Sequence, residues 1–399
     1  MDSDTSFQAL QGLKVLEFSM GVAGPHAAFL CAQHGADVVK IEPHHGDWCR
    51  TLGKPQGDLS AFFITYNRGK RSVAVDMKDA RALDAVRAMA QQADIIIEAF
   101  RPGVMARFGL DYESVNAHNP GVIYLSVNGF GSEGPLVDAP ATDTILQGFS
   151  GLMYSNRDAQ GEPQRIDYVL IDVITGLYGF QALLTALLGR NGRDGRGRHL
   201  ECSLLQSAMA FQAGKIMEDT VEGGKRPVYV PVGIFAASDG RISMSVRRDD
   251  DFNALCNALG RADLVAGGEF ATAAMRVERA DTLLPILRAE FAKYSTEELS
   301  ALLSSIDILH APVNTYAQLL SHEQTQAAKA FRWHRQEGVE KPLPLVEIPG
   351  SPAGMFLSHA PHIGEHTREA MADWGVSHDD IDALFSCGAI PSPANPPGA

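Results

Sequence analysis

The residue best suited to chemistry is Asp172, an acid at the start of a long apolar run. Residues 168–171 before it carry no charge, and no charged residue follows from 177 to 188. An unpaired carboxylate among apolar neighbours is costly, so it needs a partner or a task. Asp is a preferred N-cap, and its oxygens would accept the N–H groups of Ile174 or Thr175. The same groups, at the positive end of a helix, would keep a nucleophilic carboxylate ionised. Both roles are open, and they are compatible.

The bulk composition is that of a soluble globular protein with an acidic surface. The chain has 399 residues, of which 45% are hydrophobic, and a net charge of −14. Such a charge disfavours non-specific binding to nucleic acid or to an anionic membrane, and an anionic ligand would need a local basic patch. The five cysteines are scattered and form no C-x-x-C, which indicates reduced thiols in the cytoplasm and no zinc site. They are Cys31, Cys49, Cys202, Cys256 and Cys387.

Neither end of the chain predicts a targeting or membrane segment. Residues 1–7 are short and acidic and do not resemble a signal peptide, and residues 391–399 have the composition of a disordered tail. The run 171–188 is interrupted by polar and small residues, so we expect a buried core helix and no membrane span.

The first 130 residues alternate between strand and helix patterns, which predicts an α/β domain with a doubly wound parallel sheet. Ligands on such folds lie at the carboxyl ends of the strands. The loops expected there are 21–25, 43–53, 99–108 and 128–135. There is no G-x-G-x-x-G, so a classical NAD site is not indicated. The predicted strands are 13–18, 37–42, 72–77, 94–98 and 122–127, and the predicted helices are 26–34, 78–93 and 112–119.

Two basic clusters lie at the ends of these elements. One contains Arg68, Lys70 and Arg71; the other contains Arg101 and Arg107. Arginine forks and lysine charges suit phosphates, but solvated surface charge is an equal alternative.

Several other candidates have a plainer interpretation. Arg247-Arg248 follows a strand and could hold a substrate carboxylate or lie on the surface. The basic stretch 190–198 is best interpreted as a surface connection into a strand at 199–202. Histidines 310, 359, 362 and 366 lack metal-ligand spacing, so no metal site is expected. Glu42 and Asp143 are second-line acids, and such acids are usually structural.

The remaining chain predicts a different, smaller region. We expect a helix over 204–217, a linker over 218–231, and a β-hairpin made of 232–237 and 241–246. Helices follow at 250–259, 281–293, 296–304 and 317–331. This pattern is typical of an α+β domain.

Together these residues resemble the class III CoA-transferases, the family of formyl-CoA transferase and carnitine CoA-transferase, along nearly the whole chain. Each motif is weak alone, and their order and spacing carry the resemblance. The matching stretches are 13–42 with Ala23-Gly24-Pro25, 67–76, 98–110 with Arg101-Pro102-Gly103, 129–135, 172–176, Ala311-Pro312-Val313 and 360–367.

The resemblance implies a Rossmann-like large domain built from residues 1–220 and 326–399, a small α+β domain at 221–325, and an interlocked homodimer. It implies that Asp172 is the nucleophile of a CoA-transferase. In that scheme Asp172 attacks an acyl-CoA to give an anhydride, and CoA then forms an aspartyl-CoA thioester that the acceptor acid attacks. The helix end would keep Asp172 anionic.

Carried over by position, the family's CoA contacts fall on Ala23, Lys70, Phe100, Arg101, Arg107 and Phe108. CoA is thus implied as a substrate, with no permanently bound cofactor.

The chain departs from formyl-CoA transferase at three places. Val22 replaces a glutamine, Pro43-His44 replaces an arginine, and no polyglycine loop occurs at 220–235. We therefore expect a larger acceptor than formate or oxalate. Succinyl-CoA is a plausible donor, and Arg247-Arg248 would suit a dicarboxylate.

Three alternatives stay open. A 2-methylacyl-CoA racemase shares the fold, but its Gly-His-Asp is here Ala141-Thr142-Asp143, without the histidine. Intramolecular CoA transfer within one dicarboxylic acid is the second alternative. A non-catalytic CoA-binding protein is the third, and it would dispense with Asp172.

Overall fold

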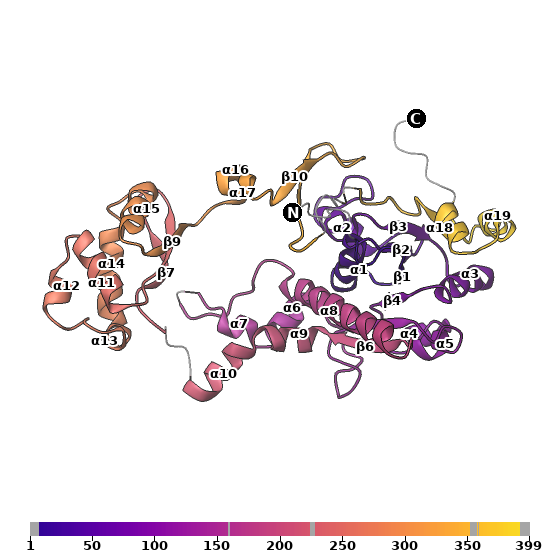
Figure 1. The fold of residues 1–399 in the computed structure, drawn as a ribbon, viewed down its shortest axis with the longest axis horizontal. Helices are drawn as coiled ribbons and strands as arrows, with labels where there is room; N and C mark the ends of the chain where they lie inside the picture. The colour runs from indigo at the N-terminus through magenta and orange to yellow at the C-terminus, as the bar shows by residue number, and fades with distance from the viewer. Residues whose placement is uncertain (1–7, 159, 224–227, 352–356, 358, 392–399) are drawn as a thin grey trace. The chain divides into compact units, whose positions relative to one another are not determined.

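The computed structural model describes residues 8–158, 160–223, 228–351, 357 and 359–391. The chain divides into two compact units. One unit is Met1–Ile216 together with Lys329–Ala399, and the other is Met217–Ala328 (Figure 1). The first unit is therefore built from both ends of the chain.

A six-stranded parallel sheet organises the first unit, as predicted. The strand order is β3-β2-β1-β4-β5-β6, and every neighbouring pair is parallel. This is the Rossmann order, in which ligands bind beyond the carboxyl ends of the strands where the order reverses, between β1 and β4. The strands are β1 (Lys14–Glu17), β2 (Asp37–Glu42), β3 (Arg71–Ala74), β4 (Ile95–Glu98), β5 (Ile123–Asn128) and β6 (Arg198–Ser203).

Helices cover both faces of this sheet. Successive strand residues point to opposite faces, so Ile97 and Leu125 pack with α1 and α8, whereas Ile96 and Tyr124 pack with α3, α18 and α19. The helical elements of this unit are α1 (Ala23–Gln33), η1 (Trp48–Thr51), α2 (Ala61–Asn67), α3 (Ala80–Ala90), α4 (Val104–Arg107), α5 (Tyr112–Asn116), α6 (Asp143–Phe149), α7 (Leu152–Ser155), α8 (Leu170–Gly192), α9 (Leu204–Phe211), α18 (Thr367–Asp373) and α19 (His378–Ser386), and a hairpin pairs β10 (Phe331–His334) with β11 (Leu343–Val346).

Gly176 allows α8 to lie directly against α1. A Cβ at this position would stand 2.8 Å from the Ala23 carbonyl oxygen and 2.7 Å from the His26 Cβ. We expect Gly176→Val to lower the free energy of unfolding by about 1–3 kcal/mol, because two packed helices must separate. Gly148→Ala in α6 is the matched control, since its Cβ would meet only Met153 Sδ at 3.7 Å. Urea unfolding that ranks the two variants equally would contradict this packing.

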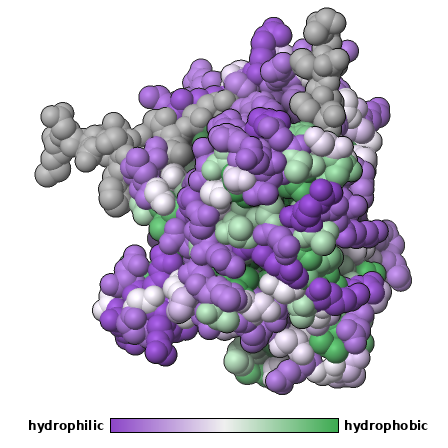
Figure 2. Space-filling view, turned by 90° about the vertical axis from the view of Figure 1, so that its right-hand side faces the viewer, coloured by the Kyte–Doolittle hydropathy of each residue, from purple (hydrophilic) through white to green (hydrophobic). Residues whose placement is uncertain are grey.

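The predicted core helix is longer and more exposed than expected. α8 spans Leu170–Gly192, and by length and composition alone it is apolar enough to cross a membrane, a test that core helices of soluble proteins also pass. Only 39% of its most apolar 18-residue window is buried, and Leu177 and Leu188 are exposed. The helix expected in the core is therefore only partly buried, with Ile171, Leu183 and Leu187 in the core. Figure 2 shows one face of the molecule, on which apolar residues stand between hydrophilic ones.

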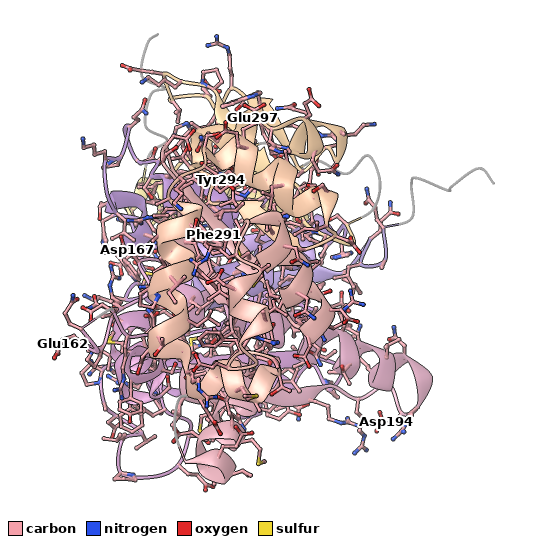
Figure 3. The ribbon with its side chains drawn as sticks, turned by 90° about the vertical axis from the view of Figure 1, so that its left-hand side faces the viewer. Glu162, Asp167, Asp194, Phe291, Tyr294 and Glu297 are labelled. Atoms are coloured by element: carbon pink, nitrogen blue, oxygen red, sulfur yellow. The ribbon has the colours of Figure 1, made fainter. Side chains whose placement is uncertain are left out.

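The second unit is a small α+β fold around an antiparallel sheet. The predicted hairpin is present, and the strand order is β7-β8-β9. Phe291, labelled in Figure 3, packs edge-on against Phe235 of the sheet with ring centroids 5.1 Å apart. Its elements are β7 (Val232–Ala236), β8 (Arg241–Ser245), α11 (Asp249–Ala258), α12 (Asp263–Ala266), α13 (Ala273–Glu278), α14 (Ala280–Phe291), α15 (Thr296–Ser305), β9 (Leu309–Pro312), α16 (Tyr316–Ser321) and α17 (Glu323–Ala327).

Two predicted helices are broken in the structure. The helix expected over 204–217 divides at Gln212, and α10 (Ala213–Glu222) extends into the predicted linker. The helix expected over 317–331 divides at His322, whose side chain caps α17 by accepting the N–H of Gln324. A local cap therefore competes with helix continuation in each case. The acidic segment 1–7 and residues 392–399 of the predicted tail lie outside the described residues.

Candidate active site

Asp172 lines a cavity of about 290 Å³ at the carboxyl edge of the parallel sheet. The cavity brings Asp172 together with Ala23, Phe100 and Arg101, three of the residues predicted to contact CoA. Its other walls are mostly small or apolar. They are formed by Met20, Val22, Gly24, Trp48, Ala99, Pro102, Val127, Asn128, Gly129, Val137, Ala139, Pro140, Ala141, Thr142 and Leu204.

Asp172 is not the N-cap of its helix, contrary to one of the two roles expected for it. It is the third residue of α8, and Val169 stands at the cap without a side-chain hydrogen bond. The helix is capped from outside by Asp143. One Asp143 oxygen accepts the N–H groups of Ile171 at 2.6 Å and of Asp172 at 3.2 Å. Asp143 is therefore the structural acid of the pair, and the Asp172 side chain is left for the cavity.

The sequence predicts that the first N–H groups of α8 keep Asp172 ionised. The structure shows instead that Asp143 accepts the N–H groups of Ile171 and Asp172. Burial, and then the Asp143 carboxylate, raise the pKa of Asp172 to about 7. Among the described residues, none donates a hydrogen bond to the Asp172 carboxylate. A desolvated carboxylate without such bonds is more basic, and so more nucleophilic, than an exposed one.

This pKa predicts a pH-dependent reaction. Only the ionised carboxylate attacks, so kcat/KM should rise with pH through about 7. Asp143→Asn removes one negative charge and keeps an oxygen for the α8 amides. We expect it to move the acid limb to lower pH by roughly one unit. Profiles of kcat/KM from pH 5 to 9 with the same midpoint in both proteins would contradict the coupling.

Two further side chains surround the first turn of α8. Nδ1 of His26 lies 3.1 Å from the Val173 carbonyl oxygen, and burial lowers the pKa of His26 to about 4. A neutral His26 donates Nδ1–H to that carbonyl. The Tyr66 ring meets His26 edge-on, 5.4 Å between centroids. Burial and then the charge of Asp172 raise the pKa of Tyr66 to about 12. Both side chains thus remain uncharged beside the carboxylate.

A second cavity, of about 550 Å³, adjoins the first. Met20 and Phe100 line both cavities, and Phe108 lines the second. Pro43 and His44, which replace the arginine of formyl-CoA transferase, also lie in this second wall. The structure therefore places four predicted CoA contacts, Ala23, Phe100, Arg101 and Phe108, along two neighbouring cavities.

The first basic cluster is held by contacts within the protein and lines neither cavity, so its role in phosphate binding stays a prediction. Lys70 is buried, with Nζ 2.7 Å from Glu17 and 2.9 Å from the Pro25 carbonyl oxygen. Arg68 donates to the carbonyl oxygens of Leu357 and Val346, and Arg71 pairs with Asp37 and Asp373. Lys70 is therefore not brought to the cavities, because a buried cation must be paired within the protein.

The second basic cluster, Arg101 and Arg107, is accessible to solvent. Arg248 and His362, two other candidates from the sequence, are paired with nearby carboxylates. Arg101 and Arg107 are exposed, and only Arg101 lines the Asp172 cavity. Arg248 is held by Asp251 in a helix cap. His362 pairs with Asp58. Within the described part of the chain, no group of three or more His, Cys, Asp or Glu side chains could hold a metal ion.

Comparison with known proteins identifies the family of this chain. The family model described as CoA-transferase family III matches residues 10–367. The chain belongs to CoA-transferase family III. It is 30% identical to the succinate–glutarate CoA-transferase of Agrobacterium fabrum, covering 91% of this chain and 95% of that protein. It is 32% identical to the acetyl-CoA:oxalate CoA-transferase of Acetobacter aceti, covering 85% and 89%. A CAIB/BAIF family protein from Brucella suis has a crystal structure with a TM-score of 0.83, 32% identity and coverage of 92% and 100%.

As a family III CoA-transferase, the chain is an enzyme that handles CoA thioesters. Its Val22, in place of the glutamine of formyl-CoA transferase, lies in the Asp172 cavity and leaves that wall apolar. No histidine lines this cavity among the described residues, so the acid/base pair of a racemase is not assembled there.

The structure adds two residues to those that the sequence indicates around Asp172. Asp143 is structural, as such acids usually are, and its place near the start of a helix about 30 residues before Asp172 was a usable signal for its contact with α8. Trp48 belongs to none of the motifs in the sequence. Its position in loop 43–53, one of the four predicted ligand loops, could have indicated it.

Proposed function

We propose that this enzyme moves CoA from an acyl-CoA donor to a free carboxylic acid, with Asp172 as the nucleophile. The observation that carries the proposal is that Asp172 and three predicted CoA contacts line one cavity at the switch point of a Rossmann-type sheet. The raised pKa of Asp172 and its lack of hydrogen-bond donors among the described residues support a reactive carboxylate.

The proposed chemistry balances in four steps. The Asp172 carboxylate attacks the thioester carbon, which forms a mixed anhydride and releases CoA thiolate. The thiolate attacks the aspartyl carbonyl, which gives an aspartyl-CoA thioester and frees the donor acid. The acceptor carboxylate then forms a second anhydride and releases the thiolate. Attack of the thiolate on the acceptor's carbonyl yields the new acyl-CoA and restores Asp172. Covalent bonding at each stage preserves the thioester energy, provided water is excluded.

CoA would lie across both cavities. Phe100 stands at their junction, so the pantetheine arm would pass beside it toward Asp172. The larger cavity, with Phe108, would take the nucleotide, because aromatic faces suit adenine. Arg101 would bind an oxygen anion of CoA.

Variants separate the CoA role of Arg101 from the structural role of Lys70. We expect Arg101→Ala to raise KM for acyl-CoA about tenfold with little loss of stability, since one charge-assisted hydrogen bond is lost. Lys70→Met should instead lower stability, because it leaves buried Glu17 without one of its cations. Thermal melts and acyl-CoA saturation curves test both. A KM effect in Lys70→Met at unchanged stability would favour the original assignment of Lys70 to CoA.

The acceptor that we propose is a small dicarboxylate, with succinyl-CoA as donor. The names of the two CoA-transferases above, one for succinate and glutarate and the other for oxalate, support an acid with two carboxylates. The apolar wall at Val22 favours a chain of several methylenes over formate. A mass-spectrometric screen of acyl-CoA donors against mono- and dicarboxylates tests this choice. Faster transfer to monocarboxylates than to glutarate would reject it.

We also propose that two copies form an interlocked dimer, in which the two units of each chain act as separate domains. Exposed apolar side chains on α8 support a partner, as does a cavity of about 960 Å³ formed by α8, β6 and α9. A cytoplasmic location is proposed from the five unpaired cysteines.

A further inference from the structure

We propose that Trp48 is the specificity-determining wall of the Asp172 cavity and sets the length of acyl group that the enzyme accepts. This inference rests on the proposed function, because it takes the Asp172 cavity to be the place where the acyl group reacts.

Trp48 is the largest side chain in the cavity wall. Most of the other lining residues are glycine, alanine, valine or proline, so the indole contributes a disproportionate part of the surface that meets an acyl chain. Met20 and Phe100 line both cavities and mark the entry of the CoA arm. Trp48 lines only the cavity with Asp172. We take this wall to lie on the acyl side of the reacting carbon.

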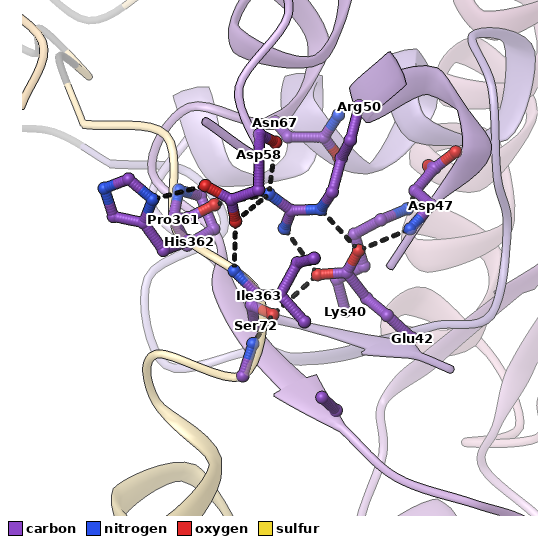
Figure 4. Close-up of polar contacts among 12 residues, drawn as sticks. Lys40, Glu42, Asp47, Arg50, Asp58, Asn67, Ser72, Pro361, His362 and Ile363 are labelled. Atoms are coloured by element: carbon purple, nitrogen blue, oxygen red, sulfur yellow. Dashed lines mark hydrogen bonds and ion pairs between the residues drawn. The ribbon is translucent and has the colours of Figure 1, made fainter. Parts of the chain in front are cut away.

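A buried turn presents the indole to the cavity. Trp48 begins the short helix η1, and its neighbours Asp47, Cys49 and Arg50 are buried, whereas Trp48 itself is 51% exposed. Arg50 is anchored below the turn by Glu42, with contacts of 2.6 and 2.9 Å (Figure 4). Because the side chains of Asp47 and Cys49, on either side of Trp48, are buried, the backbone of Trp48 has little freedom to move.

Asp47 joins this turn to the loop on the other side of the indole. Its carboxylate accepts the N–H of Gly21 at 3.0 and 3.2 Å and that of Cys49 at 2.8 Å, and it pairs with buried Lys40 at 3.0 Å. Asp47 and Lys40 appear together in Figure 4. Asp47 is thus a positioning residue for Trp48, and it acts without touching substrate.

The indole lies directly on the backbone of Gly21. A Cβ at Gly21 would stand 2.5 Å from Trp48 Cζ2, and Gly21 has a φ of +83°, which favours glycine. The ring therefore has a backbone on one side and the cavity on the other. Because the Gly21 backbone stands behind the indole, a longer acyl chain would clash with the ring.

The test compares acids of increasing length in wild type, Trp48→Ala and Trp48→Leu. With succinyl-CoA as donor, kcat/KM is measured by mass spectrometry for isotope-labelled succinate, glutarate and adipate, because the label distinguishes newly formed succinyl-CoA from the donor. We expect Trp48→Ala to raise the adipate-to-succinate ratio about tenfold, the effect of one or two methylenes in an apolar pocket. Trp333→Ala is the matched control, because Trp333 is also more than half exposed but lies on β10 and does not line the cavity. An unchanged ratio in both folded Trp48 variants would overturn the inference.

A binding experiment separates this result from a failure of the proposed function. If Asp172→Asn proves as active as wild type, the proposed chemistry is wrong, whatever Trp48 does. The dissociation constants of succinyl-CoA and adipyl-CoA, which need no turnover, then decide about the wall. A ratio that Trp48→Ala shifts toward adipyl-CoA supports it, and an unchanged ratio overturns it.

Discussion

Replacing Asp172 by Asn should lower kcat/KM for CoA transfer by at least about 10⁴-fold, because the reaction loses its nucleophile. The substitution keeps the size and shape of the side chain. Asp143 still caps α8, since its contacts run to the backbone N–H groups of Ile171 and Asp172 and not to the Asp172 side chain. The loss therefore reports chemistry and not a collapsed helix. Initial rates of acyl-CoA exchange measure it.

The thermal stability of Asp172→Asn provides the control, because the direction of its change follows from the raised pKa of Asp172. Asp ionises with a pKa of about 3.9 in an unfolded chain, and the folded value is raised to about 7. The stability contributed by the protonated carboxyl is fully present below pH 4 and is lost as the pH rises through 7. At pH 8 the ionised Asp172 therefore destabilises the fold, on the order of a few kcal/mol. Asp172→Asn should melt higher than wild type at pH 8 and much like it at pH 4.

We therefore expect Asp172→Asn to be inactive and, at pH 8, more stable than wild type. An active Asp172→Asn variant would contradict the nucleophile assignment. A variant that is inactive and also melts lower at pH 8 would contradict the electrostatic description of the site, because removal of a desolvated charge should not destabilise the protein.

Replacing Arg50 by Met should lower the free energy of unfolding by about 3–5 kcal/mol, because it leaves a buried carboxylate unpaired. Arg50 is 1% exposed, holds both oxygens of Glu42, and donates to the Pro361 carbonyl oxygen at 3.0 Å and to Asp58 at 3.2 Å (Figure 4). The loss thus also frees the returning C-terminal segment. Urea unfolding followed by circular dichroism measures it.

A compensating variant identifies the cause. Glu42→Gln in the Arg50→Met background removes the stranded charge, keeps an acceptor oxygen for the Asp47 N–H, and offers an amide N–H to the Ser72 hydroxyl oxygen. We expect it to recover part of the loss. Arg81→Ala is the surface control, since its ion pair with Asp79 is exposed to solvent and adds little stability. No recovery in the double variant would show that lost packing, and not an unpaired charge, dominates.

The parallel sheet was predictable because its strands are short apolar runs with turn residues between them. Ile95–Ile97 shows why: an apolar run of this kind is buried on both faces, as is typical of a strand inside a parallel sheet. The breaks at Gln212 and His322 were not predictable, because they coincide with side-chain hydrogen bonds that apolar periodicity does not record.

Side chains on the strand-end loops around the Asp172 cavity could be predicted from the sequence. Buried side chains that contact one another could not. Arg101 and Phe100 lie on a strand-end loop, as the topology required. Lys70 has the same sequence signature, but the charge of Glu17 turns it into the core. The protonation of Asp172 depends first on its burial and then on Asp143, which lies 29 residues away and contacts the same helix end. Such long-range pairs are set by tertiary packing, which the local sequence does not encode.

The most direct test of the central claim is to trap the acyl group or CoA on Asp172. The enzyme is incubated with succinyl-CoA and hydroxylamine, digested and analysed by mass spectrometry. Hydroxylamine attacks the activated aspartyl carbonyl, so we expect a hydroxamate on the peptide that contains Asp172. The adduct should require the acyl-CoA and be absent from Asp172→Asn. A hydroxamate on a different acid, or efficient CoA transfer with no adduct at Asp172, would contradict it.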